Sequence, residues 1–285
     1  MAAQRSVSIL NESPTRIPSI DGHLKTAEEV SVEVQQILNR MKNEFISSDG
    51  KSVDYIGWKR SDLFTEYTDL IQELRSLDMT SLTEEGKTAF FINIYNALVI
   101  HGLCALEKLP ESVMKVEPFW NTTGYNIGGH NFSLHDILHG VLRANRPHPS
   151  SKALPFEMSD PRLVFVIKSF DPRIHFAITF GAKSCPAFSV YSASSLDKQL
   201  SAATAHYLED ELSVYQVQRQ VKVSRLFQWY WSDFGCNDVE AVRWCAAHVP
   251  GDKQYCLQLL LHQLETEGMV DIIYKEYFWN LNVYN

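Results

Sequence analysis

The chain has 285 residues, 45% of them hydrophobic and 21% charged, which are the proportions of an ordinary folded globular protein. Its net charge of −8 argues against a nucleic-acid backbone as a partner. We find no apolar run of about 18 residues and no secretory signal, so we expect no membrane contact. Five cysteines without a C-x-x-C pair fit a reducing compartment, and we expect a cytoplasmic protein.

The N-terminal part of the chain predicts a tail and two helices. Residues 1–23 contain scattered Pro, Ser and Asn without periodicity, which predicts a flexible tail. Two amphipathic patterns follow, over 24–47 and 61–77, each with one apolar stripe. We expect them to form a helical pair within residues 24–80 that packs on a main domain spanning 81–285.

The next predicted helix, over about 81–107, is apolar on almost every side and should be buried. It nevertheless carries Asn93, Asn96 and His101 within one arc. A buried amide or imidazole costs about 1–3 kcal/mol unless it is hydrogen-bonded. These side chains therefore either bond to neighbouring backbone, the commoner arrangement, or line a polar pocket.

A hairpin with a Gly-Gly turn is predicted over 125–132, and a helix over 134–143 follows it. On this helix His135, His139 and Arg143 share one face at intervals of four residues. The Pro/Ser-rich loop after it is long for a compact domain, and such loops often have a function.

The stretch 171–186 reads D-P-R-I-H-F-A-I-T-F-G-A-K-S-C-P and follows a predicted buried strand at 163–167. Alternating apolar residues over 173–180 predict a second strand, which ends at a glycine. This strand would carry His175 on its small-residue face and present Cys185 in the loop at its tip.

The remaining pattern predicts further helices and strands without an internal repeat: helices over 194–212, 224–235, 239–248 and 252–265, a hairpin over 214–223 and a strand over 270–274. The predicted fold class is α+β, a small sheet flanked by helices together with the N-terminal helical pair. A papain- or transglutaminase-like layout is a weak analogy for it.

Cys185 is a candidate nucleophile with His175 as its base. A thiolate reacts and a thiol does not, and both Lys183 and a nearby imidazolium would favour the thiolate. The N–H groups of the loop would stabilise an oxyanion, and Asn96 or Asp171 would orient the imidazole. The alternative is a buried structural cysteine.

A metal site is the second possibility that the residue types allow. His135 and His139 present two imidazoles on one helix face, and His101, His175 and Cys185 would add ligands. No glutamate follows the first histidine in the H-E-x-x-H manner, and a polar helix face explains the pair more simply. We therefore expect no bound metal and no other cofactor.

Basic residues gather near the same segments of an otherwise acidic protein: Arg143, Arg146, Arg162, Arg173 and Lys183. They suggest recognition of an anion. The alternative, slightly favoured, is that Arg173 pairs with Asp171 inside its loop.

Three ordered segments resemble one family closely: F-F-I-N-I-Y-N-A-L-V-I-H-G at 90–102, Y-N-I-G-G-H-N-F-S-L-H-D-I-L-H-G-V-L-R at 125–143 and the stretch 171–186. The segment S-R-L-F-Q-W-Y-W-S-D-F-G at 224–235 agrees. Over roughly 60–285 the chain is similar to the domain of unknown function 547 family. Animal relatives resemble proteins that also carry glutaredoxin and DEP domains. Plant relatives resemble leucine-zipper proteins described as interaction factors, which leaves a protein partner open.

The residues that match the family's motifs supply the candidate site: Asn93, Tyr95, Asn96, His101, His139, Arg143, Asp171, Arg173, His175, Lys183, Ser184 and Cys185. We assign Cys185, His175, Asn96 and Asp171 to catalysis and the others to substrate binding.

Three segments depart from the family's pattern. Leu138 replaces the glutamate of the usual D-I-E-H-G, and Phe180 replaces a cysteine common before G-A-K-S-C. The C-terminal D-W-S-L-N is F-W-N-L-N here, at 278–282. If the missing acid or cysteine were catalytic, this chain would have an altered specificity or be inactive. With Phe180 present, a dithiol mechanism at Cys185 lacks its partner.

The leading hypothesis is a thiol-dependent enzyme that transfers or hydrolyses the acyl group of an amide, ester or thioester in a small-molecule or peptide substrate. The first alternative is a non-enzymatic protein-interaction module in which the same polar residues are structural. The second is a His/Cys metal-dependent enzyme.

Overall fold

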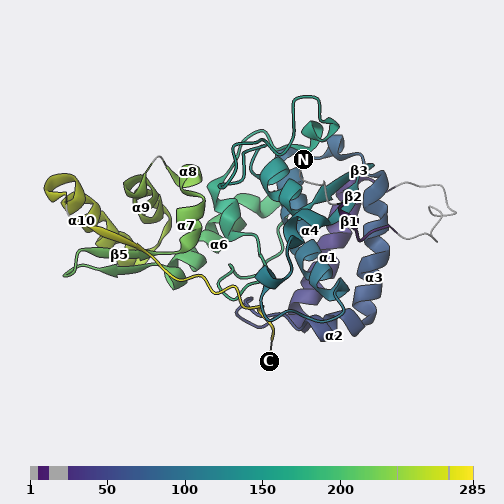
Figure 1. The fold of residues 1–285 in the computed structure, drawn as a ribbon, viewed down its shortest axis with the longest axis horizontal. Coiled ribbons are helices and arrows are strands. Elements are labelled where there is room, and N and C mark those ends of the chain that lie inside the picture. The colour runs from purple at the N-terminus through teal and green to yellow at the C-terminus, as the bar shows by residue number, and fades with distance from the viewer. Residues whose placement is uncertain (1–5, 13–24, 236, 269, 285) are drawn as a thin grey trace. The chain divides into compact units, whose positions relative to one another are not determined.

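The computed structural model describes residues 6–12, 25–235, 237–268 and 270–284, and it divides into two compact units (Figure 1). The units are made of these ranges: Met1–Asp171, Ile178–Leu196 and Trp279–Asn285 in the first, and Pro172–Ala177 and Asp197–Phe278 in the second. Each unit has its own buried core. The chain is an α+β protein, as predicted, because helices are combined with two three-stranded sheets.

The first unit contains most of the helices. Its α-helices are α1 (Ala27–Phe45), α2 (Tyr55–Arg60), α3 (Asp62–Leu70), α4 (Glu84–Ala105) and α5 (Phe119–Thr122). Its strands are β1 (Ser8–Ile9), β2 (Thr123–Ile127) and β3 (His130–Ser133). Short 3₁₀ helices are η1 (Ile71–Ser76), η2 (Met79–Ser81), η3 (Val113–Lys115), η5 (Pro161–Phe165) and η7 (Ala193–Ser195), and η4 (Asp136–Leu142) is a π-helix.

Helix α4 is the central element of the first unit. Thr83 caps it by accepting a hydrogen bond from the Gly86 N–H, and every residue from Gly86 to Cys104 is buried. By length and composition α4 is apolar enough to cross a membrane, yet 94% of its most apolar window is covered by the rest of the protein. The apolar surface on all its sides is therefore used for packing in this fold.

The sheet of the first unit has the order β1-β2-β3. Strands β2 and β3 form the predicted hairpin, in which Gly128 and Gly129 both have positive φ angles, +57° and +82°. Strand β1 pairs with β2 in parallel, and the Asn11 side chain donates to the carbonyls of Ile71 and Asn126. Of the predicted flexible tail, 1–5 and 13–23 lie outside the described residues.

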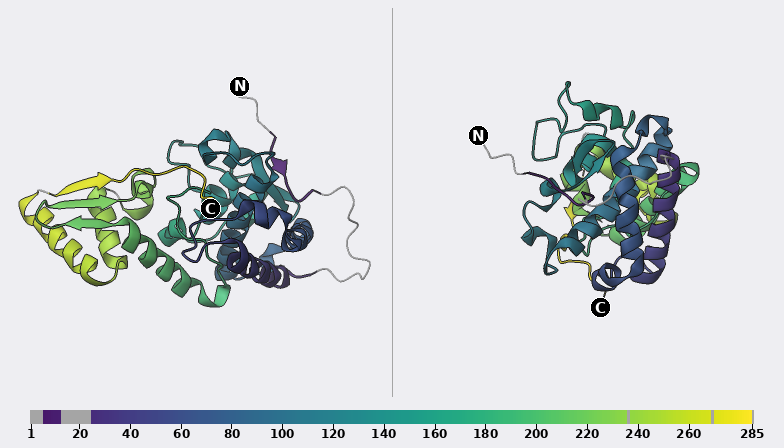
Figure 2. Two further views of the ribbon diagram at one scale, coloured as in Figure 1. Left: turned by 90° about the horizontal axis from the view of Figure 1, so that it is seen from below. Right: turned by 90° about the vertical axis from the view of Figure 1, so that its right-hand side faces the viewer.

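The second unit contains a sheet and most of the C-terminal helices. Its elements are η6 (Pro172–Phe176), α6 (Leu196–Glu211), β4 (Ser213–Tyr215), β5 (Gln220–Val223), α7 (Arg225–Trp229), α8 (Trp231–Phe234), α9 (Asp238–His248), α10 (Gly251–Glu267) and β6 (Asp271–Tyr274). Strand β5 lies between β4, which is antiparallel to it, and β6, which is parallel (Figure 2). The rings of Phe176, Phe227, Phe234 and Trp244 form an aromatic core.

Two predicted strands are wrong. The ranges 163–167 and 173–180 contain 3₁₀ turns instead, and none of residues 172–186, all of which are described, lies in a strand. Each turn begins at a proline, whose fixed φ suits the first position of a helix. Because Ile174 to Ala182 are buried on both sides, the alternation of apolar residues did not mark one face of a strand.

Two predicted helices also differ in detail. The pattern over 61–77 forms α3 and then continues as the 3₁₀ helix η1. The pattern over 134–143 forms the π-helix η4, in which the Arg143 N–H bonds to the Leu138 carbonyl at 2.9 Å. Apolar spacing reports which residues face the core, but it distinguishes poorly between these related helical geometries.

Candidate functional site

Cys185 lies in a tight loop whose backbone N–H groups are directed at its sulfur. The distances to Sγ are 3.0 Å from the Phe180 nitrogen and 3.4 Å from the Ala182 nitrogen. Gly181, between these two residues, has a φ of +77°, and its own N–H donates to Thr179 Oγ1. The Cys185 side chain is buried. Two N–H donors converging on one atom stabilise negative charge there, as in other anion-binding backbone turns.

Side-chain amides of α4 hold the segment that contains this loop. Asn96 Oδ1 accepts a hydrogen bond from the Thr179 N–H at 2.9 Å. Asn93 bonds to both backbone groups of Tyr191, at 2.9 Å to its N–H and 2.7 Å to its carbonyl. Both amides therefore bond to neighbouring backbone, which is the commoner of the two arrangements that the sequence left open.

The C-terminal end of the chain closes the loop from another direction. The Lys183 N–H donates to the Asn280 carbonyl at 2.9 Å, and the Asn282 N–H donates to the Gly181 carbonyl at 3.1 Å. Tyr55 Oη donates to Asn282 Oδ1 at 2.6 Å. Burial raises the pKa of Tyr55 well above its ordinary value, and the neighbouring thiols of Cys185 and Cys104 raise it further.

Three other predicted site residues lie in or beside the loop. The ring of Tyr95 meets that of Phe180 edge to face, with centroids 6.5 Å apart. Ser184 is half-buried, and Lys183 is exposed. Phe180, which stands where relatives often have a cysteine, thus contributes both a ring contact and a backbone donor to the thiol loop.

His175 is buried in the second unit against a carboxylate. Its Nε2 lies 2.7 Å from Asp233 Oδ2, and both side chains are fully buried. The rings of Tyr230 and Phe234 pack against the imidazole. Asp233 is a residue that the sequence analysis missed, although it belongs to the S-D-F-G end of a segment that carries the family resemblance.

Arg173, also in the second unit, bonds to α6. Its guanidinium lies 2.9 Å from the Asp197 carboxylate and donates to Ser201 Oγ at 2.7 Å. Asp171 belongs to the first unit and directly precedes η6 in the chain. The proposed roles of Arg173 in substrate binding and of Asp171 in catalysis stay predictions.

His101 is part of a buried hydrogen-bonded chain of aromatic residues. Its Nδ1 lies 2.7 Å from Tyr125 Oη, which is 2.7 Å from Tyr67 Oη. Burial lowers the pKa of His101 to about 4. The imidazole is therefore neutral near pH 7, and its contacts are those of a structural core residue.

His139 and Arg143 lie in a cluster of three imidazoles. The His139 ring centroid is 4.7 Å from that of His135 and 4.9 Å from that of His148. Arg143 Nη1 lies 2.8 Å from His139 Nδ1 and donates to the Pro147 carbonyl. Since a guanidinium can only donate, His139 Nδ1 is the acceptor and this imidazole is neutral.

The predicted metal ligands fall into separate surroundings. His101 bonds to a tyrosine, and the three clustered imidazoles lie around Arg143. Among the described residues, no group of three or more His, Cys, Asp or Glu side chains has the arrangement needed to hold a metal ion. The His/Cys metal-dependent alternative thus has no donor set in this part of the chain.

Comparison with known families agrees with the motifs around the thiol loop. The model of the family described as "Protein of unknown function, DUF547" matches residues 79–208. These residues belong to the DUF547 family. The DUF547 segment includes α4, the β2–β3 hairpin, η4 and the Cys185 loop, and it ends within α6. Asp233 lies beyond it.

No curated protein and no solved structure matches the chain. The papain- or transglutaminase-like layout therefore stays a prediction.

Proposed function

We propose that the chain is a thiol-dependent enzyme in which Cys185 attacks the acyl carbon of an amide, ester or thioester. The observation that carries the proposal is the pair of N–H groups, from Phe180 and Ala182, directed at the Cys185 sulfur. A thiol sulfur is a weak hydrogen-bond acceptor, whereas a thiolate attracts donors strongly. Donors fixed by the fold therefore favour the nucleophilic form, and a cysteine that only fills an apolar core needs none.

His175 is the proposed base, and Asp233 is the residue that orients it. With Asp233 bonded to Nε2, the neutral ring carries its proton on Nε2 and its lone pair on Nδ1. The same carboxylate stabilises the imidazolium that forms when Nδ1 takes up a proton. The assignment of His175 as the base of Cys185 comes from the sequence pattern and is part of the proposal.

In the proposed reaction the Cys185 proton passes to His175, and the sulfur forms a bond to the acyl carbon as the carbonyl π electrons move to oxygen. When the carbonyl re-forms, the leaving amine, alcohol or thiol takes the proton from the imidazolium and departs. A thioester remains on Cys185. Attack by water completes hydrolysis, and attack by a second nucleophile completes transfer. The free thiol that this reaction needs agrees with the expected reducing, cytoplasmic compartment.

Labelling the cysteines with iodoacetamide over a range of pH, with mass spectrometry of each peptide, tests the proposal. We expect Cys185 to react at least about tenfold faster at pH 7 than Cys256, although Cys256 is the more exposed, because a thiolate reacts and a thiol does not. Cys104 is the matched buried control, since burial raises its pKa to about 12. Labelling of Cys185 as slow as that of Cys104 would contradict the proposal.

Turnover of acyl donors, such as p-nitrophenyl esters and thioesters, gives the second arm of this test. Cys185→Ser is expected to abolish turnover at an unchanged melting temperature, and Cys256→Ser to leave turnover intact. Asp233→Asn removes the carboxylate from His175 and should slow both turnover and Cys185 labelling, whereas a merely structural Asp233 would leave labelling unaffected.

The second candidate is a non-enzymatic protein-interaction module, and it is favoured by the bracing roles of several predicted site residues. Asn93, Asn96 and Arg143 all bond to backbone or to a neighbouring side chain of the same unit. In that case Cys185→Ala and His175→Ala destabilise the protein, and no electrophile selects Cys185. The labelling experiment therefore separates the two candidates.

A further inference from the structure

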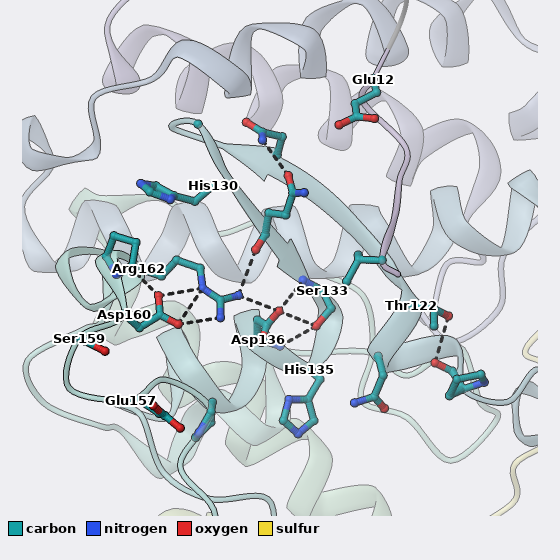
Figure 3. A pocket seen from close by; sticks show the side chains of 18 residues that line it. Glu12, Thr122, His130, Ser133, His135, Asp136, Glu157, Ser159, Asp160 and Arg162 are labelled. Atoms are coloured by element: carbon teal, nitrogen blue, oxygen red, sulfur yellow. Dashed lines mark hydrogen bonds and ion pairs between the residues drawn. The ribbon is translucent and has the colours of Figure 1, made fainter. Parts of the chain in front are cut away.

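A broad polar cleft on the first unit contains none of the residues assigned above to catalysis or substrate binding. Its volume is about 1230 Å³, somewhat larger than the roughly 300–1,000 Å³ typical of sites for drug-sized ligands. Its walls come from separate parts of the chain: the N-terminal segment at Glu12, the end of α5, the β2–β3 hairpin, the start of η4 and the loop Pro155–Arg162 (Figure 3). Because these walls are far apart in sequence, the cleft is a product of the folded unit.

A network of ion pairs fixes the middle of the cleft. Arg162 lies between two carboxylates, with Nη1 3.1 Å from Asp136 Oδ2 and Nη2 2.8 Å from Asp160 Oδ2. Its guanidinium also stacks over the Phe156 ring, 4.3 Å from the centroid, and donates to the Asn131 carbonyl. The charge of Arg162 is thus already paired, and it offers little attraction to an anionic ligand.

Two further carboxylates face the cleft without such a cation. Glu12 and Glu157 are exposed, and among the described residues neither carboxylate has a hydrogen-bond or ion-pair partner. In Figure 3 they lie on opposite sides of the Asp136–Arg162–Asp160 group. Burial lowers the pKa of His135, another lining residue, so its imidazole adds little positive charge near pH 7. The lining therefore carries a net negative charge at both sides.

We propose that this cleft binds an extended polypeptide segment that carries at least two lysine or arginine side chains. The two separated carboxylates require two cationic groups with a spacer between them, and a peptide supplies both. The lining also offers the Asn121 amide and the Ser159 hydroxyl, which suit hydrogen bonds to peptide groups. The site is distinct from the thiol site, and the inference does not depend on the proposed function.

Binding of a fluorescein-labelled (Lys-Gly)₄ peptide to the full chain, followed by fluorescence anisotropy, tests this inference. We expect saturable binding that weakens as NaCl is raised, because the attraction is between exposed charges. The double variant Glu12→Gln/Glu157→Gln should weaken binding about fivefold, the combined effect of two exposed ion pairs. Both replacements are on the surface, and thermal unfolding should be unchanged.

A matched variant, Glu44→Gln/Glu107→Gln, removes the same charge from exposed positions of the first unit outside the cleft. It should change the affinity less than about twofold. Equal weakening by both double variants would show that only the acidity of the whole protein matters, and would overturn the inference. So would the absence of saturable binding up to about 1 mM, equal binding of a (Glu-Gly)₄ peptide, or spermine binding more tightly than the lysine peptide.

Discussion

Three of the buried polar side chains of the central helix α4, those of Asn93, Asn96 and His101, are each satisfied by a different partner. Asn93 and Asn96 bond to backbone groups of the segment that carries Cys185, and His101 bonds to Tyr125. An unpaired polar group at these positions would cost about 1–3 kcal/mol. The two amides therefore fix the thiol loop against α4, while the imidazole joins α4 to the tyrosines of the aromatic chain.

The buried imidazole of His101 makes the stability of the first unit depend on pH. Its pKa falls from 6.5 to about 4 on folding, because burial penalises the charged form. Above about pH 6.5 the ring is neutral in both the folded and the unfolded chain, and the full stability is present. As the pH falls toward 4 the unfolded chain takes up a proton that the folded chain does not, and this stability is lost. We expect the free energy of unfolding, measured with urea, to fall by about 3 kcal/mol between pH 7 and pH 4 from this residue.

The control for this prediction is His101→Asn, which keeps a polar atom near Tyr125 but does not titrate in this range. Its unfolding free energy is expected to be lower than wild type at pH 7 and to depend less steeply on pH. If the variant and the wild type show the same slope between pH 7 and pH 4, another group is responsible.

Among the elements, the π-helix η4 shows how one glycine and one distant ring fix a local geometry. An ideal Cβ on Gly140 would lie 2.3 Å from the Phe156 ring, so the ring occupies the space of the missing side chain. Asn145 holds Phe156 there by bonding to both its N–H and its carbonyl, each at 2.9 Å. The wider turn of η4 and the loop after it are therefore parts of one packing arrangement.

Gly140→Ala is expected to destabilise the protein by about 2 kcal/mol, because the new methyl group overlaps a ring that Asn145 holds in place. Chemical denaturation gives the measurement. Gly129→Ala is the comparison, since nothing lies within 4 Å of a Cβ at that position. The expected cost there is about 1 kcal/mol, because alanine must adopt the left-handed backbone conformation of Gly129, with φ of +82°. A Gly140→Ala variant as stable as wild type would show that Phe156 moves freely.

For the whole molecule, the decisive feature is the return of the chain's end to the first unit. Residues Trp279–Asn285 belong to that unit, although the preceding segment belongs to the second. Asn282 donates through its side chain to the Lys51 carbonyl, accepts from Tyr55, and donates through its N–H to Gly181. The start, middle and end of the chain therefore meet beside the thiol loop.

Asn282→Ala should lower the free energy of unfolding by about 2 kcal/mol, because it leaves the buried Tyr55 hydroxyl and the Lys51 carbonyl without this partner. Differential scanning calorimetry measures the change. Asn280→Ala is the control, since that side chain is exposed and its backbone bond to Lys183 is kept; it should change stability by less than about 0.5 kcal/mol. Equal effects of the two variants would mean that the Asn282 side chain does not join these segments.

The sequence by itself determined the α+β class, the buried helix α4, the β2–β3 hairpin and the family resemblance, because these depend on local periodicity, turn residues and motifs. It could not determine that residues 172–186 form turns, since burial on both sides gives the same alternation of apolar residues as a strand. Nor could it find Asp233 beside His175 or the cleft around Arg162. Those depend on contacts between residues far apart in the chain, which only the tertiary packing brings together.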